Sequence, residues 1–152
     1  MNEKAQLALG ARLAKACDDK GCVIFLQGDL GAGKTTTVRG FLSGLGYQGK
    51  VKSPTYTLVE SYALKNHAVC HVDLYRIEQP KEIFGLGLFD TPDHVKEKII
   101  YLIEWPEKAA TELPVPDITC NITLFEHKKG RACQIMAHTV HGEKIMQAMI
   151  DA

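Results

Sequence analysis

The sequence lacks the features of a membrane-anchored, secreted or strongly charged protein. It holds no apolar run long enough to cross a bilayer, and it opens without the pattern of a signal peptide. Lys plus Arg and Asp plus Glu both number 18, so the formal net charge is zero. This balance argues against a large nucleic-acid-binding surface. We therefore expect a cytoplasmic protein that contacts neither membrane nor DNA; the charge balance does not exclude RNA brought by a partner.

Cysteine pairing is also absent from the sequence. The five cysteines are scattered, and none forms a Cys-x-x-Cys pair: Cys17, Cys22, Cys70, Cys120 and Cys133. An odd, unpaired set predicts neither a disulfide framework nor a zinc site. With 152 residues, the chain is expected to form one domain, residues 1–152, which buries roughly 70% of its unfolded surface without cross-links.

What the sequence does contain is a stretch that matches a phosphate-binding P-loop. Residues 28–35 read Gly-Asp-Leu-Gly-Ala-Gly-Lys-Thr, and a second threonine follows. Its glycines let successive backbone N–H groups turn inward around a phosphate, where a Cβ would crowd the turn. Lys34 has the reach to contact the β- and γ-phosphates, and the Thr35 hydroxyl can bind Mg²⁺. The stretch predicts these nucleotide-binding residues: Asp29, Leu30, Gly31, Ala32, Gly33, Lys34, Thr35 and Thr36.

The segments on either side of the loop agree with this interpretation. Residues 22–26 form an apolar run typical of a β-strand, and apolar side chains recur after the loop at helical spacing: Val38, Phe41, Leu42 and Leu45. A strand that leads into a glycine-rich loop and then a helix is the setting in which a helix N-terminus binds phosphate.

The rest of the chain predicts further helices and strands. Helices are expected over residues 3–17, at a short turn over 79–84, from Thr91 as N-cap, and over 141–152, where Ile145, Met146, Met149 and Ile150 should face inward. Strands are expected over residues 55–64, 68–72, 99–103, 118–124 and 131–139, the first two and the last two as antiparallel hairpins. We predict an α/β fold, with parallel strands at the centre of a mixed sheet and helices on both faces.

Two carboxylates follow apolar strands. Asp73 comes after residues 69–72, and Glu104 after the most apolar run, residues 99–103. Ligands of open α/β sheets bind at the carboxyl ends of the strands, so both are candidates for the metal and water contacts that hydrolysis needs. A capping or salt-bridging role is the alternative for each, and the sequence leaves their division of labour open. His71, on the same strand face as Asp73, is interpreted as structural.

Two further segments have a packing and a functional interpretation. Trp105 follows Glu104, and either packs or contacts a nucleotide or partner. The Ser53-Pro54-Thr55 segment is compatible with a switch loop that senses a γ-phosphate and with an ordinary turn. No Asn-Lys-x-Asp guanine motif and no Arg-rich lid are found, which disfavours a typical GTPase and a small-molecule kinase; Arg76 and Arg131 stand isolated.

Four stretches together resemble one family. They are residues 28–36, 53–59 (Ser-Pro-Thr-Tyr-Thr-Leu-Val), 71–76 (His-Val-Asp-Leu-Tyr-Arg) and 103–107 (Ile-Glu-Trp-Pro-Glu). In order and spacing they are similar to the TsaE (YjeE) family, P-loop ATPases of bacterial tRNA threonylcarbamoyladenosine biosynthesis. The resemblance covers nearly the whole chain, and implies a single P-loop NTPase domain whose central parallel strands are flanked by antiparallel ones. Family members usually carry a short segment before the first helix, which begins here almost at once.

The resemblance also implies a function and its cofactors. It implies an ATPase that uses ATP and Mg²⁺, yields ADP, and acts with the TsaB–TsaD pair, which transfers a threonylcarbamoyl group to the adenosine next to the anticodon of tRNA. Contact with tRNA would then be indirect. A small-molecule kinase and a nucleotide-gated adaptor with negligible hydrolysis are the alternatives.

Residue roles carry over from the motifs. Lys34 would hold phosphates, Thr35 and Glu104 would bind the metal, and Asp73 would be needed for hydrolysis. Thr55 lies in the segment that corresponds to the switch loop, and Trp105 belongs to the last motif, which favours a nucleotide contact for both. P-loop enzymes that lack an arginine finger hydrolyse slowly until a partner completes the site, so weak activity of the isolated protein is expected.

Overall fold

The protein is described by a computed structural model over residues 1–17, 20–125, 127 and 129–152. The α-helices are α1 (Glu3–Ala16), α2 (Lys34–Gly44), α3 (Asp93–Lys96) and α4 (Val140–Asp151). The strands are β1 (Cys22–Gln27), β2 (Val59–Ala63), β3 (Ala68–Asp73), β4 (Ile99–Glu104), β5 (Ile118–Phe125) and β6 (Gly130–Ala137). The described residues also form the 3₁₀ helices η1 (Pro80–Leu86), η2 (Pro106–Lys108) and η3 (Ala110–Glu112).

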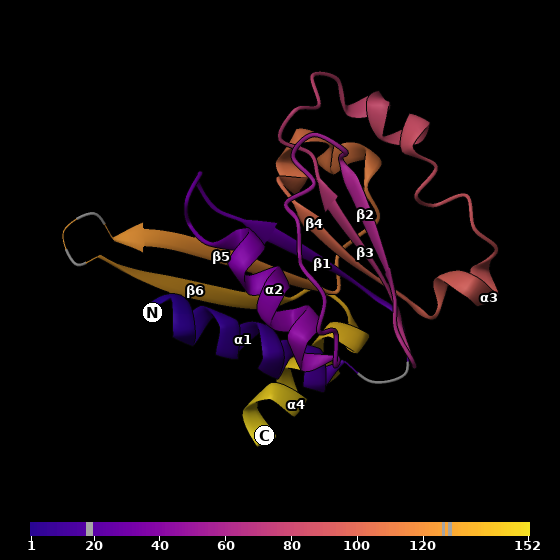
Figure 1. Ribbon diagram of the computed structural model, residues 1–152. Helices are drawn as coiled ribbons and strands as arrows, with labels where there is room; N and C mark the ends of the chain where they lie inside the picture. Colours follow the sequence, from indigo (N-terminus) through magenta and orange to yellow (C-terminus); the bar gives the residue numbers. More distant parts are fainter. Residues whose placement is uncertain (18–19, 126, 128) are drawn as a thin grey trace.

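One mixed sheet organises the chain. Its strand order is β2-β3-β4-β1-β5-β6, with β3, β4, β1 and β5 parallel and the two edge strands antiparallel to their neighbours. The predicted mixed sheet with central parallel strands and two antiparallel hairpins is therefore confirmed. The apolar β4 lies between β3 and β1, as its composition predicts, and Figure 1 shows the β5–β6 hairpin extending beyond the rest of the sheet.

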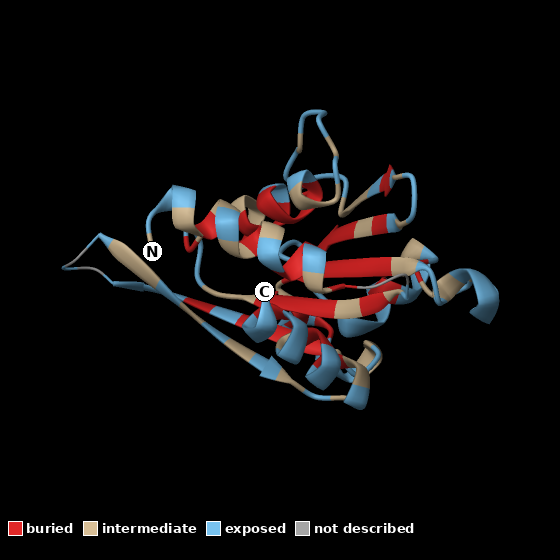
Figure 2. Cartoon of the chain, turned by 90° about the horizontal axis from the view of Figure 1, so that it is seen from below, coloured by how far each residue is buried: buried red, intermediate tan, exposed pale blue. Residues whose placement is uncertain are grey.

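The two faces of the sheet are covered differently. Successive side chains of β1 point to opposite faces of the sheet. Ile24 and Leu26 belong to a core cluster with α1, α2 and α4, whereas Phe25 belongs to a second cluster with residues 74–113. That segment carries the 3₁₀ helices, so α-helices cover one face and mainly 3₁₀ turns cover the other. Figure 2 shows the buried residues concentrated along the central strands and the helix faces turned toward them.

Three local expectations were wrong. The strand expected from residue 55 begins only at Val59, because Leu58 has a left-handed backbone with φ of 66° that interrupts extended structure. Thr91 is not an N-cap, since α3 begins at Asp93 with Pro92 at the cap position. Ile150 does not face inward, because at 69% exposure it lies on the outer side of α4, where Ile145 and Met149 are buried.

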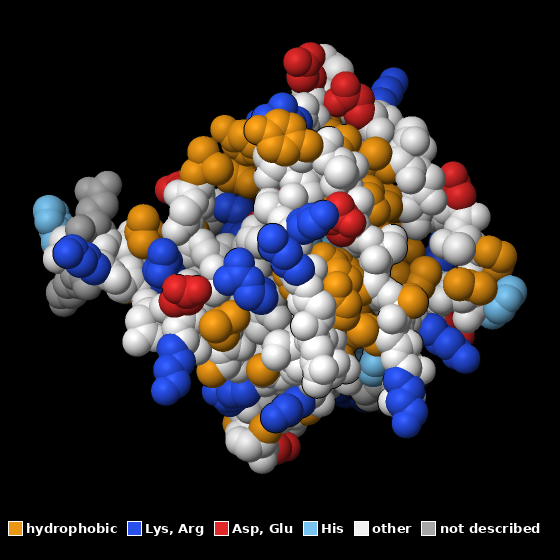
Figure 3. Space-filling model, viewed as in Figure 1, with side chains coloured by type: hydrophobic (Ala, Val, Ile, Leu, Met, Phe, Trp, Pro, Cys, Tyr) orange, Lys and Arg blue, Asp and Glu red, His pale blue; other side chains and the backbone are white. Residues whose placement is uncertain are grey.

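Charged side chains are spread over the face of the molecule shown in Figure 3. On the face shown in Figure 3, basic and acidic side chains are interspersed with uncharged surface. In the described part of the chain, no helix combines the length and the apolar character needed to cross a bilayer.

The contact between α1 and α2 depends on close approach of their backbones. A Cβ on Gly40 would collide with the backbone of Leu7, and a Cβ on Gly10 would collide with backbone atoms of Thr37 and Phe41. Glycine at these two positions lets α1 lie directly on the helix that follows the P-loop.

We expect Gly40→Ala to lower the free energy of unfolding by about 1–3 kcal/mol, because the new methyl group meets main-chain atoms that cannot move independently. Urea denaturation of the variant measures this change. Gly85→Ala is the matched control, since a Cβ there meets no atom within 4 Å. Equal stability of Gly40→Ala and the wild type would contradict this account of the helix contact.

Candidate functional site

The loop between β1 and α2 has the backbone conformation that its glycines permit. Gly31 and Gly33 have φ values of 80° and 103°, in the left-handed region that side chains with a Cβ rarely adopt. Gly33 is the N-cap of α2 and supplies no side-chain cap, so the first N–H groups of this helix remain available to a ligand. A helix start of this kind favours an anion.

The loop is braced from outside by residues distant in sequence. Buried Gln6 of α1 donates from Nε2 to the carbonyl oxygens of Ala32 at 2.9 Å and Gly33 at 3.4 Å. Arg131 of β6 donates from Nη2 to the carbonyl oxygen of Gly31 at 3.2 Å. Sequence reasoning missed both residues. A polar side chain on the inward face of α1 was a usable signal for Gln6, whereas no local signal marks Arg131.

Lys34 is buried with its charge directed into the loop. Its Nζ donates to the carbonyl oxygens of Gly28 at 2.5 Å and Asp29 at 3.0 Å, and lies 4.2 Å from the ring centroid of Trp105. Desolvation by burial lowers the pKa of Lys34, although Glu104 and other nearby carboxylates oppose this shift. A phosphate would supply the anionic partner that compensates the desolvation of this ammonium group.

Trp105 holds its place through an uncommon backbone conformation. Its φ and ψ are 58° and 47°, which is the left-handed region for a bulky residue. The ring lies against Tyr75, with centroids 5.0 Å apart, as well as over Lys34. Strained conformations of this kind tend to occur at functional sites. Trp105 therefore packs against neighbouring side chains in the structure, and its contact with a nucleotide or partner stays a prediction.

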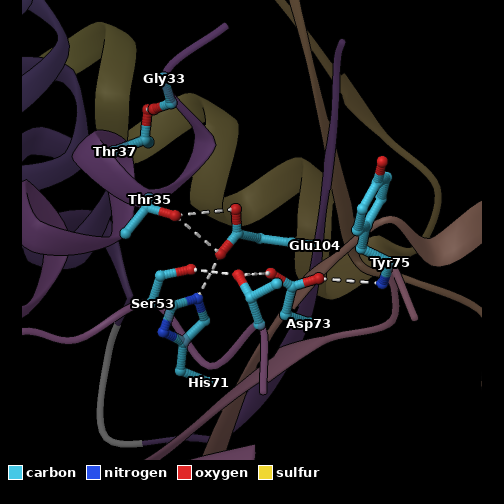
Figure 4. Close-up of polar contacts among 9 residues, drawn as sticks. Gly33, Thr35, Thr37, Ser53, His71, Asp73, Tyr75 and Glu104 are labelled. Carbon is cyan, nitrogen blue, oxygen red and sulfur yellow. Dashed lines mark hydrogen bonds and ion pairs between the residues drawn. The ribbon is translucent and has the colours of Figure 1, made fainter. Parts of the chain in front are cut away.

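The two carboxylates lie on neighbouring strands at the same edge of the sheet. Asp73 ends β3 and Glu104 ends β4, and the two residues are register partners. Both oxygens of Glu104 accept from the Thr35 hydroxyl, at 3.1 and 3.2 Å (Figure 4). The parallel pairing of β3, β4 and β1 thus brings both acids to the end of the strand that enters the P-loop.

His71 contacts one of these carboxylates. It is fully buried, and its Nε2 lies 2.6 Å from Oε2 of Glu104. Figure 4 shows Thr35, Glu104 and His71 as a chain of polar contacts. The histidine therefore helps to fix the orientation of Glu104 through Oε2, the oxygen that also accepts from Thr35, while its own ring stays buried.

Asp73 is tied to the segment that follows α2. Its Oδ2 accepts from Thr55 Oγ1 at 3.3 Å, and Thr55 Oγ1 lies 2.8 Å from Ser53 Oγ. Its Oδ1 accepts from the backbone N–H of Tyr75 at 2.9 Å. Burial raises the pKa of the Asp73 carboxyl, and nearby Glu104 adds to this rise, whereas the Tyr75 N–H opposes it.

These side chains line one pocket of about 280 Å³. It is lined by Leu30, Gly31, Gly33, Lys34, Thr35, Thr36, Ser53, Thr55, Asp73, Glu104, Trp105 and Arg131. Of the predicted site residues, Asp29 and Ala32 are not in this lining. Asp29 contributes its carbonyl oxygen to Lys34, and Ala32 is fully buried beneath the loop.

The donor set in the pocket suits Mg²⁺. This ion binds oxygen, and commonly takes one or two protein groups while phosphates and waters supply the remaining positions. Thr35 and Glu104 present a hydroxyl and a carboxylate side by side. In contrast, a larger cavity of about 580 Å³ at the opposite ends of β1 and β4, lined by Cys22, Tyr101 and mostly apolar neighbours, contains no P-loop residue.

Fold and site together define a domain of the P-loop NTPase class. The family model described as "Threonylcarbamoyl adenosine biosynthesis protein TsaE" matches residues 1–133. The chain belongs to the TsaE family, whose members take part in tRNA threonylcarbamoyladenosine biosynthesis.

Individual relatives agree with this assignment. The TsaE protein of Haemophilus influenzae is 41% identical over 97% of this chain and 92% of its own length. The TsaE protein of Rickettsia felis is 32% identical over 91% of this chain and 78% of its own. The crystal structure of Bacillus subtilis YdiB aligns with a TM-score of 0.77 at 26% identity, covering 99% of this chain and 90% of that one. The resemblance predicted from the four motifs is therefore confirmed.

Removing the charge of Asp73 should stabilise the protein at neutral pH. Because burial raises the pKa of this carboxyl above its ordinary value of 3.8, its ionised form destabilises the folded state. Asp73→Asn keeps the shape and an acceptor for the Tyr75 N–H, so we expect a higher melting temperature at pH 7. In a domain of this size, the melting temperature rises by about 2–4 °C for each kcal/mol added to the free energy of unfolding.

The sign of the pH dependence is part of this prediction. The penalty in the wild type is full above the folded-state pKa of Asp73 and disappears as the pH falls to the unfolded-state value, so the advantage of Asp73→Asn should shrink between about pH 7 and pH 4. Exposed Asp93 provides the control, and Asp93→Asn should show no such advantage. A constant or growing advantage at lower pH would contradict the assignment.

Proposed function

We propose that this protein is a Mg²⁺-dependent ATPase that binds the TsaB–TsaD pair and supports threonylcarbamoyladenosine formation in tRNA. The observation that carries the proposal is the convergence of Lys34, Thr35, Asp73 and Glu104 on one pocket at the P-loop. The proposed reaction converts ATP and water to ADP and phosphate. Cytoplasmic location remains a prediction from the sequence.

The P-loop residues perform the binding. The Lys34 ammonium exchanges its carbonyl partners for phosphate oxygens, and the N-terminus of α2 adds its free N–H groups. Thr35 and Glu104 hold Mg²⁺, which when bound neutralises phosphate charge and the charge that develops during phosphoryl transfer. His71 keeps Glu104 in the orientation that this requires.

The contacts of the two acids support a division of labour. Glu104 contacts the predicted metal-binding hydroxyl of Thr35, whereas Asp73 contacts Thr55 and the backbone of Tyr75. We therefore assign the metal to Glu104, and the orientation of the attacking water to Asp73. Burial raises the pKa of Asp73, which makes this carboxylate a better proton acceptor than an exposed one.

The same geometry supports slow hydrolysis by the isolated protein. Among the described residues that line the pocket, the one arginine is Arg131. Its side chain is hydrogen-bonded to the Gly31 carbonyl oxygen, and its strand lies on the other side of β1 from the strand of Asp73. A cation at the transferred phosphate commonly accelerates P-loop enzymes by several orders of magnitude. We propose that the partner pair supplies or organises such a group.

Hydrolysis of Mg-ATP should therefore be weak for the purified protein and should rise when TsaB and TsaD are added. Lys34→Ala and Glu104→Ala should abolish the stimulated activity, with losses of about 100-fold or more, because they remove phosphate and metal contacts. Phosphate release in single- and multiple-turnover assays measures both effects.

Matched surface variants control for nonspecific effects. Lys144→Ala and Glu143→Ala change the same residue types on the exposed side of α4 and should leave turnover unaltered. Brisk activity without partners would contradict the proposal. Phosphate transfer to a small alcohol would replace it with a kinase, and nucleotide-dependent binding to the pair without hydrolysis would replace it with an adaptor.

A further inference from the structure

We propose that Arg131 is a nucleotide-binding residue that contacts the α-phosphate at the nucleoside end of the P-loop site. This inference rests on the nucleotide binding in the proposed function, and adds a residue from the opposite side of the sheet. The proposed contact is with the α-phosphate, which stays attached to the nucleoside when the terminal phosphate is released.

The strand order places Arg131 across the P-loop from the acidic residues. Asp73 and Glu104 come from β3 and β4, on one side of β1. Arg131 comes from β6, two strands away on the other side of β1. Since β6 runs antiparallel to β5, and Arg131 pairs with Leu124, its first residues lie beside the carboxyl end of β5. That is the edge of the sheet at which the P-loop lies.

The Arg131 backbone is fixed at this edge. Its N–H donates to the carbonyl oxygen of Met1 at 3.1 Å, and its carbonyl oxygen accepts from the amine of Met1 at 2.5 Å. The side chain is then held by the 3.2 Å hydrogen bond from Nη2 to the Gly31 carbonyl oxygen. Arg131 thus enters the lining of the P-loop pocket with both its backbone and one end of its guanidinium group positioned.

The guanidinium group retains unused binding capacity. Its Nε is buried and makes no hydrogen bond within the described part of the chain. The ion pairs formed by the described residues do not include Arg131. A buried donor on a charged group is costly to leave without an acceptor, and an arginine binds phosphate oxygens through several N–H groups at once. An anion in the pocket satisfies both requirements.

The direction of the nucleotide follows from the two ends of the pocket. Thr35, Glu104 and Asp73 define the end that takes the metal and the cleaved phosphate. A nucleotide whose terminal phosphate lies there extends along the P-loop toward Gly31 and β6, so its α-phosphate approaches Arg131. The contact is therefore shared by ATP and ADP, and it is lost for ligands that consist of the β- and γ-phosphates alone.

Displacement of a fluorescent ADP analogue tests the proposal. Arg131→Ala should lower the affinity for both ADP and ATP by about tenfold to a hundredfold. This is the range for loss of a hydrogen bond to a charged group. The affinity of Arg131→Lys for ADP and ATP should lie between those of Arg131→Ala and the wild type. The inhibition constant for inorganic pyrophosphate, which occupies only the terminal positions, should change less than about twofold. Arg39→Ala is the control, since Arg39 on α2 is half exposed and pairs only weakly with Glu3.

Each alternative gives a different result. Unchanged ADP affinity in Arg131→Ala would overturn the proposal. An equal loss of affinity for ADP and for pyrophosphate would also overturn it, because Arg131 would then act only by positioning the Gly31 carbonyl group. Lost turnover with unchanged ADP affinity would make it a transition-state arginine instead. Failure of the wild type to bind ADP would refute the proposed function itself, and thermal unfolding of each variant verifies that it is folded.

Discussion

Three charged side chains buried at one edge of the sheet impose the main constraint on this structure. Lys34, Asp73 and Glu104 are each at most 5% exposed, and buried charges are tolerated only where polar partners surround them. Each has a separate set of partners: loop carbonyls for Lys34, Thr55 and a backbone N–H for Asp73, and Thr35 with His71 for Glu104. This arrangement requires β3, β4 and β1 to end in register.

The position of the P-loop depends on both ends of the chain. Gln6 near the start and Arg131 near the end donate to the successive carbonyl oxygens of Ala32 and Gly31 in the loop. The first helix also lies on the helix that follows the loop, through the glycine contact of Gly40 with Leu7. The loop is therefore part of a larger packed unit, and substitutions in α1 can alter the site without removing a group that contacts the ligand.

Local patterns in the sequence were sufficient for part of this arrangement. The P-loop, the apolar central strand and the acids after two strands could be predicted, because each depends on residue type and short spacing. The left-handed backbone of Leu58 shortened a strand whose alternation was otherwise regular. The contacts of Gln6 and Arg131 span 26 and 100 residues, so they depend on strand order, which periodicity does not specify. His71 was interpreted as structural, and its contact with Glu104 depends on pairing between β3 and β4.

The placement of Trp105 has a consequence for spectroscopy. The sequence contains a single tryptophan, and its ring lies over Lys34 and against Tyr75 in the P-loop pocket. The entire tryptophan emission of the protein therefore originates beside the lysine that is expected to hold phosphate. Any movement of that lysine changes the charge next to the indole, so the unlabelled protein carries its own optical sensor of events in this pocket.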